Sequence, residues 1–201
     1  MNFYSNKICR RYGIKTTDSN KSPLVKRNYP PGFHGPKGRG RRSDYGEQLA
    51  QKQKAKVIYN LREKQFRLTF DKAQRLQGDA GFNLLKLLEL RLDNVIYRLG
   101  FAKSRPAARQ LVNHAHIRVN GRRVNIPSFK LKEGDEITVK EKSQKSKYFE
   151  IIKQELDPQN VPGWLNLDVK SLSAKLLHEP KTETDVDQSI DTRAIVEFYS
   201  K

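Results

Sequence analysis

The dipeptide Asn120-Gly121 lies in the middle of the run IRVNGRRV, residues 117–124, and strongly restricts the local backbone. A two-residue turn between antiparallel strands needs positive φ at both central positions, which Asn and Gly tolerate. Because β-branched residues flank the turn, the sequence predicts a β-hairpin. A Gly-Asp pair at 134–135 predicts a further turn, and residues 136–139 predict another strand.

Two helices are expected directly before this hairpin. Residues 83–99, NLLKLLELRLDNVIYRL, have apolar residues at helical spacing that form one buried stripe. Ser104 is a suitable N-cap and Pro106 fits a first helical turn, so a short helix is expected from Arg105 to about His114. The sequence therefore predicts a module of helix, helix, hairpin and strand.

The polar residues of the two helices are spaced so that they lie on faces other than the apolar ones. They are Arg91, Asn94 and Arg98 in the first helix, and Arg105, Arg109 and Asn113 in the second. Three arginines on the hairpin arms extend this set. Such a basic face either is solvated or binds phosphates, and the helices alone leave both interpretations open.

Residues 1–43 are rich in Gly and Pro and lack apolar periodicity, which predicts an arm without a core of its own. The arm is either a solvated tail or a segment that orders against phosphates. In the second case Arg39, Arg41 and Arg42 would make bidentate contacts. The two interpretations are compatible if the arm folds on binding.

The pair Asp44 and Glu47 predicts the start of a helix that runs to about Tyr59, with Asp44 as the capping residue. Lys52 and Lys54 on this helix are either an ordinary solvated face or RNA contacts.

A second helix is expected over about residues 61–76. Phe66, Phe70 and Ala73 recur there at helical spacing, which indicates core residues rather than base-stacking platforms.

The net charge of +18 points to a polyanionic partner, because Lys and Arg that neutralise phosphates release condensed counterions. Residues 1–65, 66–150 and 151–201 carry net charges of +12, +9 and −3, so the polyanion should contact the first three quarters of the chain.

No run of about 18 apolar residues or apolar N-terminal stretch is present, which predicts a soluble intracellular protein that does not enter a membrane. The single Cys9 cannot form an internal disulfide.

Residues 88–139, from LELRLDNVIYRLGF to KLKEGDEITV, closely resemble the RNA-binding domain named after small-subunit ribosomal protein four. The flanks resemble that ribosomal protein family itself. They include NYPPGFHG, SDYGEQLAQKQKAK and REKQFRLTF before the module, and PGWLNLD and IVEFYSK after it. The resemblance therefore extends over nearly the whole chain.

This resemblance implies an α+β protein with a basic arm (1–43), a helical domain (44–82, completed by 186–201) and an RNA-binding domain with a linker (83–180). It implies a non-enzymatic constituent of the small ribosomal subunit that binds the five-prime domain of its RNA at a multi-helix junction and nucleates assembly. Neighbouring proteins of the subunit, especially ribosomal protein five, are expected partners. Through these contacts the protein would affect translational accuracy. No homo-oligomer is expected. The family resemblance is to bacterial members, which predicts a cytoplasmic ribosome, and an organellar ribosome remains open.

Carried over by position, the resemblance assigns a set of RNA-facing residues within the module. They are Arg91, Asn94, Lys103, Ser104, Arg105, Arg109, His114, His116, Arg118, Asn120 and Arg122, to which the helical face adds Arg98. No cofactor is expected. Some family members hold zinc through four cysteines, but Cys9 stands alone, so we exclude zinc.

Two alternatives use the same RNA-binding module. Pseudouridine synthases have a catalytic Arg-Leu-Asp, which is present here as Arg91-Leu92-Asp93. However, it lies inside the module and is followed by Asn94 and not by the residues usual in those enzymes, so Asp93 is expected to orient Arg91 or a neighbouring donor. Free-standing RNA chaperones are the second alternative, but their chains are usually short and lack the flanking motifs.

Overall fold

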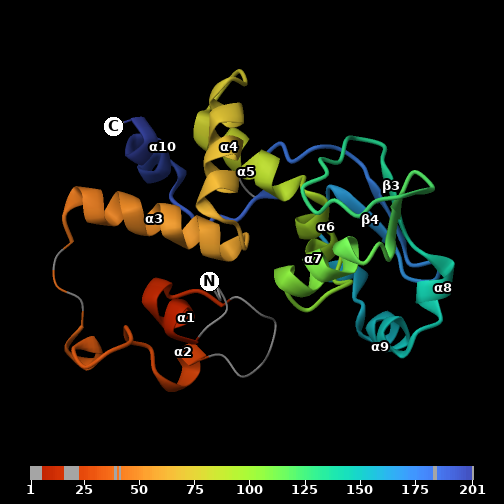
Figure 1. The fold of residues 1–201 in the computed structure, drawn as a ribbon, viewed down its shortest axis with the longest axis horizontal. Helices are drawn as coiled ribbons and strands as arrows, with labels where there is room; N and C mark the ends of the chain where they lie inside the picture. The colour runs from red at the N-terminus through yellow and green to blue at the C-terminus, as the bar shows by residue number, and fades with distance from the viewer. Residues whose placement is uncertain (1–5, 16–22, 39, 41, 183–184, 201) are drawn as a thin grey trace. The chain divides into compact units, whose positions relative to one another are not determined.

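The computed structural model describes residues 6–15, 23–38, 40, 42–182 and 185–200 (Figure 1). The expected phosphate ligands Arg39 and Arg41 lie outside the described residues. The chain divides into two units. One comprises Met1–Leu84 with Gln188–Lys201, and the other comprises Leu85–Asp187.

The first unit is helical. Its helices are α1 (Asn6–Tyr12), α2 (Pro23–Lys26), the 3-10 helix η1 (Gly35–Lys37), α3 (Asp44–Ile58), α4 (Glu63–Gln74) and α10 (Thr192–Ser200), and α5 (Ala80–Glu89) crosses the boundary to the second unit. The predicted core residues Phe66, Phe70 and Ala73 are buried on α4, as expected. Ser43, and not Asp44, caps α3, because its side chain accepts a hydrogen bond from the backbone N–H of Gly46.

The described parts of the basic arm adopt local structure, although their composition predicts no core. The Arg10 guanidinium donates to the backbone carbonyls of Tyr29 and Pro30 at 3.0 and 3.2 Å, and it lies 4.6 Å from the centre of the Tyr29 ring. Cys9 and Ile14 are buried. Internal contacts thus shape this segment, and a description as a purely solvated tail is incomplete.

The C-terminal helix α10 packs against α3 and α4. The Tyr199 ring stacks on Phe70 with centroids 4.5 Å apart. Gln48 donates a 2.8 Å hydrogen bond to the carboxylate of Glu197, and the ammonium of Lys52 lies 4.3 Å from the centre of the Phe198 ring. Aromatic and charged contacts from α10 therefore complete the helical unit.

Glu63 links these three helices through a partly buried set of polar contacts. Its carboxylate accepts from Lys52 at 3.0 Å, from Lys56 at 2.6 Å and from the Tyr199 hydroxyl at 2.8 Å. Lys52 is only 6% exposed, which corrects the expectation of a solvated or RNA-facing position. Burial opposes ionisation of Glu63, but hydrogen bonds from Lys56, Lys52 and Tyr199 outweigh it and lower its pKa to about 2.

We expect the Glu63 contacts to stabilise the first unit in a pH-dependent way. Because the folded pKa lies below the ordinary value, the unfolded chain binds the proton more readily, and the stabilisation is complete only above the unfolded pKa. It should decline as the pH falls from the ordinary pKa of glutamate through about 2. In thermal unfolding, the Tm of the wild type should exceed that of Glu63→Gln. The difference between the two Tm values should be constant near neutral pH and should become smaller in acid. A difference independent of pH would contradict this assignment.

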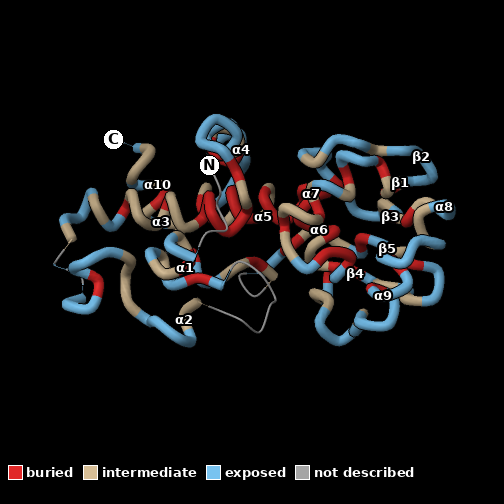
Figure 2. The backbone as a smooth tube through the Cα atoms, turned by 60° about the horizontal axis from the view of Figure 1, so that its bottom comes forward, coloured by how far each residue is buried: buried red, intermediate tan, exposed pale blue. Residues whose placement is uncertain are grey.

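The second unit combines helices with a five-stranded antiparallel sheet in the order β2-β1-β3-β5-β4. Figure 2 labels all five strands. Its elements are α6 (Leu92–Arg98), α7 (Arg105–Asn113), β1 (Ile117–Val119), β2 (Arg122–Arg123), β3 (Glu136–Val139), α8 (Glu141–Gln144), α9 (Lys147–Glu155), η2 (Pro158–Asn160), β4 (Leu165–Asp168) and β5 (Ser173–Leu176). Alternate strand residues such as Ile117, Val119 and Ile137 join α6, α7 and α9 in one apolar core. The sheet therefore has one face that packs against helices and one polar face.

The predicted hairpin, second helix and third strand are confirmed. Asn120 and Gly121 have φ of 50° and 75°, as the tight turn requires. The Ser104 hydroxyl accepts from the backbone N–H of Ala107 and caps α7.

The predicted single helix over 83–99 is wrong, because the structure has two helices that are interrupted at Leu90 and Arg91. The loop before β3 causes the break. Its backbone pairs with the interruption, since Leu131 N–H donates to the Leu90 carbonyl and Arg91 forms a β-bridge with Lys130. Long-range hydrogen bonds thus replace the helical ones at this point.

The segment after β3 was expected to be a linker, yet it contributes β4, β5 and the fully buried Trp164. Ala174 and Leu176 on β5 also lie in the apolar core. These residues are therefore part of the folded second unit and not a linker outside it.

Candidate RNA interface

A buried carboxylate organises the junction of α5 and α6. Glu89 is 0% exposed, and it accepts hydrogen bonds from the Asn94 amide at 2.6 Å and from Arg98 Nε and a terminal guanidinium nitrogen at 2.9 and 2.6 Å. Arg98 is therefore held by a bidentate ion pair, and a quarter of its side chain remains exposed. The sequence places these groups together but does not indicate that Glu89 is buried.

The same cluster continues into α7. The Asn94 side-chain carbonyl accepts a 2.8 Å hydrogen bond from Arg105 Nε, and the guanidinium carbon of Arg105 lies 4.4 Å from the centre of the Tyr97 ring. Arg105 and Asn94 are both buried. They hold two helices together, which corrects the expectation that both point outward.

Asp93 forms a second set of buried contacts. It accepts two hydrogen bonds from Arg91, at 3.0 and 2.8 Å, and lies 3.8 Å from a nitrogen of Arg109. The prediction that Asp93 orients Arg91 is confirmed. Because both residues are buried and paired, Arg91 does not contribute to an exposed face. Arg109 is the more accessible of the two arginines that Asp93 contacts, with 38% of its side chain exposed.

The hairpin presents its arginines on two different faces of the sheet. Arg118 on β1 is directly opposite Arg123 on β2, and residues in register share a face. Arg118 alternates with buried Ile117 and Val119, so this pair lies on the polar face. Arg122 pairs with Val119 and lies on the side of the helices. Figure 2 shows β2 as fully exposed.

Directly opposed like charges destabilise a sheet, so the Arg118 and Arg123 pair has a cost in the isolated protein. Among the described residues, neither guanidinium has a carboxylate within ion-pairing distance. This arrangement suits an anionic partner. The sequence prediction included Arg118 and Arg122 but missed Arg123, which strand alternation would have placed beside Arg118.

Other predicted residues have local roles. Asn120 ties the turn to β3, because its amide donates to Asp135 at 2.7 Å and its carbonyl accepts from the Glu136 backbone at 2.9 Å. Exposed Lys103 pairs with Glu155 at 2.7 Å.

The two predicted histidines differ in their surroundings. His114 is exposed at the end of α7, whereas His116 pairs through Nδ1 with Ser143 at 2.9 Å. Burial, together with His114 and Lys140, lowers the pKa of His116 below its ordinary value. His116 therefore contributes little positive charge at neutral pH.

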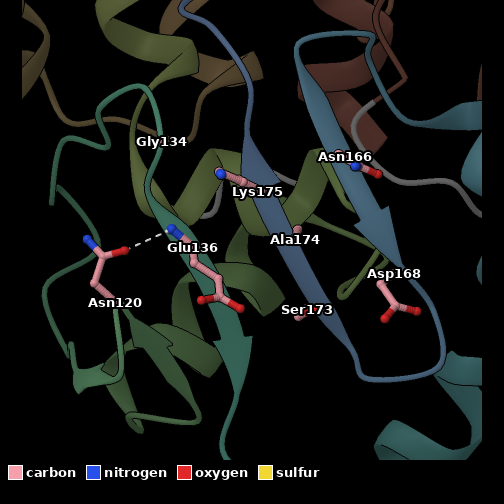
Figure 3. A pocket seen from close by; sticks show the side chains of 8 residues that line it. All are labelled: Asn120, Gly134, Glu136, Asn166, Asp168, Ser173, Ala174 and Lys175. Atoms are coloured by element: carbon pink, nitrogen blue, oxygen red, sulfur yellow. Dashed lines mark hydrogen bonds between the residues drawn. The ribbon is translucent and has the colours of Figure 1, made fainter.

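A groove of about 420 Å³ crosses the other half of the polar sheet face, over β3, β5 and β4 (Figure 3). Glu136, Lys175 and Asn166 stand in register across these strands, and Asp168 lies further along β4. The two carboxylates in this groove would repel phosphates. The groove is therefore unsuited to the RNA backbone.

Basic residues of the first unit are placed as follows. Arg42 pairs with Glu47 at 2.9 Å, and Lys54 donates to the backbone carbonyl of Ser189. Exposed basic residues remain along α4, and they are Lys64, Arg67, Lys72 and the capping Arg75.

In the part of the chain that the structure describes, no group of three or more His, Cys, Asp or Glu side chains could hold a metal ion. Within the same residues, no helix has the length and hydropathy needed to cross a membrane.

Comparison with known proteins matches two family models. One, described as the ribosomal protein S4/S9 N-terminal domain, covers residues 2–89, and the S4 domain covers residues 90–137. The chain is 49% identical over 198 residues to small ribosomal subunit protein uS4 of Roseiflexus castenholzii, with 97% of this chain and 96% of the relative aligned. It is 48% identical to uS4A of Clostridium perfringens, with the same coverage, and 45% identical to uS4 of Rubrobacter xylanophilus, with 96% and 94% coverage.

Proposed function

Because the chain belongs to the uS4 family of small ribosomal subunit proteins, we propose that it is a structural constituent of that subunit and binds ribosomal RNA with the second unit's hairpin and helices. It is not an enzyme. The buried and paired state of Asp93 agrees with this conclusion, since a catalytic carboxylate must be accessible to its substrate.

The opposed pair of Arg118 and Arg123 is the observation that best supports RNA binding. Two arginines that lie opposite each other on neighbouring strands can each donate charge-assisted hydrogen bonds to phosphate oxygens. Arg109, His114 and Arg122 provide further donors from α7 and the hairpin edge. Phosphate contacts of this kind supply affinity, whereas the shape of folded RNA supplies selectivity.

Finer assignments rest on the resemblance of the flanking motifs. We propose that the RNA site is a multi-helix junction in the five-prime domain and that binding nucleates subunit assembly. We further propose a contact with ribosomal protein five that affects translational accuracy, a chain that forms no homo-oligomer, and a place in cytoplasmic ribosomes. The proposed RNA contacts also include Arg39, Arg41 and Arg42 of the arm.

Sedimentation tests the proposed function against the RNA chaperone alternative. In growing cells the tagged protein should migrate stoichiometrically with small subunits, and crosslinking followed by RNA sequencing should recover the five-prime domain. The purified protein should also bind a ribosomal RNA transcript with an affinity that falls linearly with salt on a logarithmic scale. Migration free of subunits with intact transcript binding would favour the chaperone function.

A further inference from the structure

We propose that Glu89 is a positioning residue for RNA binding, and that its buried negative charge increases affinity for a polyanion by orienting Arg98 and fixing α6 against α7. This inference rests on the proposed function. Simple electrostatics predicts the opposite sign, because a carboxylate near an RNA surface repels phosphates.

The geometry around Glu89 supports a positioning role. Both carboxylate oxygens are engaged, one by a terminal Arg98 nitrogen at 2.6 Å and the other by Arg98 Nε at 2.9 Å and the Asn94 amide at 2.6 Å. The parallel bonds from Arg98 fix the plane of its guanidinium, which a single contact would not do. A quarter of the Arg98 side chain stays exposed, so the ion pair does not bury Arg98 completely.

Glu89 also determines which way the Asn94 amide faces. The amide nitrogen donates to the Glu89 carboxylate at 2.6 Å and to the Glu89 backbone carbonyl at 3.2 Å, so the side-chain carbonyl oxygen is directed to Arg105 Nε at 2.8 Å. Arg105 is the first residue of α7 and lies over the Tyr97 ring of α6. One carboxylate therefore links the end of α5 to the start of α7. The position of α7 in turn determines where Arg109 and His114 lie.

A buried charge is costly unless all of its contacts are made. Replacing Glu89 with Gln keeps the side-chain shape but places an N–H group against the N–H donors of Arg98 and Asn94. The guanidinium of Arg98 would lose its bidentate partner. The Asn94 amide nitrogen would keep only its 3.2 Å hydrogen bond to the Glu89 backbone carbonyl, which weakens the orientation of the side-chain carbonyl that Arg105 contacts. The RNA surface would gain net positive charge and lose its fixed geometry.

The test measures binding of full-length Glu89→Gln to a five-prime domain transcript at several salt concentrations. We expect the affinity to fall about tenfold, which is the effect of losing one charge-assisted hydrogen bond. We also expect the slope of log affinity against log salt concentration to decrease by the amount that corresponds to about one phosphate contact. Glu133→Gln, an exposed change of the same charge in the same unit, is the matched control and should leave affinity unchanged or slightly higher. Circular dichroism of each variant checks that the fold is intact.

Arg98→Lys provides a second, milder variant because the positive charge is retained and only the bidentate geometry is lost. It should also weaken binding, and it decides the question if Glu89→Gln does not fold. The positioning role is overturned if folded Glu89→Gln binds the transcript as tightly as the wild type or more tightly. If Glu89→Gln is unfolded, the same result in Arg98→Lys overturns it. If the wild type fails to bind the transcript, the proposed function fails instead.

Discussion

Replacing Trp164 with alanine is expected to lower the free energy of unfolding of the second unit by about 3 to 5 kcal/mol. Trp164 is fully buried in the core that α6, α7, α9 and the sheet share. Removing the indole would create a large cavity between the sheet and its helices, and the surrounding side chains could relax only partly. A loss of this size is a large fraction of the stability of a domain.

Chemical denaturation followed by circular dichroism measures this effect. Trp164→Phe is the matched control, because the indole N–H has no hydrogen-bond partner in the described structure, so the change removes volume without breaking a hydrogen bond. We expect Trp164→Phe to be clearly less destabilised than Trp164→Ala. Equal stability of Trp164→Ala and the wild type would mean that the segment after β3 is a linker outside the folded module.

The double variant Arg118→Ala with Arg123→Ala is expected to reduce affinity for the ribosomal transcript by roughly 100-fold or more. Hydrogen bonds to charged groups contribute about 1.5 kcal/mol or more each, and 1.4 kcal/mol corresponds to a factor of ten. Two fewer phosphate contacts should also make the salt dependence shallower by about 1.5 in slope. Filter binding at several salt concentrations measures both quantities.

A Tm measurement and a charge-matched control distinguish the loss of these contacts from unfolding and from a general loss of positive charge. Because the two arginines are directly opposed, their removal should not lower the Tm and is expected to raise it slightly. Lys147→Ala with Lys175→Ala removes two exposed positive charges elsewhere in the same unit and is the charge-matched control. An equal loss of affinity in the control would show that binding depends on overall charge and not on the hairpin arginines.

The sequence predicts the local elements well where a residue type has one dominant conformational preference. The Asn120-Gly121 turn, the Ser104 cap and the strand at 136–139 all follow from short-range backbone requirements. Core positions on α4 also follow from spacing, because a helix that buries one face needs apolar residues at that period.

Predictions failed where a distant segment competes with local preference. The apolar run over 83–99 has helical spacing, yet backbone hydrogen bonds to the loop before β3 interrupt it at Leu90 and Arg91. Likewise β4 and β5 have little strand signal of their own. They form because β5 pairs with β3, β4 pairs with β5, and the core accepts Leu165 and Ala174.

The sequence alone determined the basic character of the chain, the helix, helix and hairpin order, and the residue types available for binding RNA. Only the tertiary structure decided which of those residues reach the surface. Arg91, Asn94, Arg105 and Lys52 are buried beside carboxylates, amides or aromatic rings. In contrast, the partly exposed Arg118 and the exposed Arg123 lie opposite each other on the polar sheet face. The physical reason is that charge is a property of a residue, but exposure depends on which distant groups pack against it and pair with it.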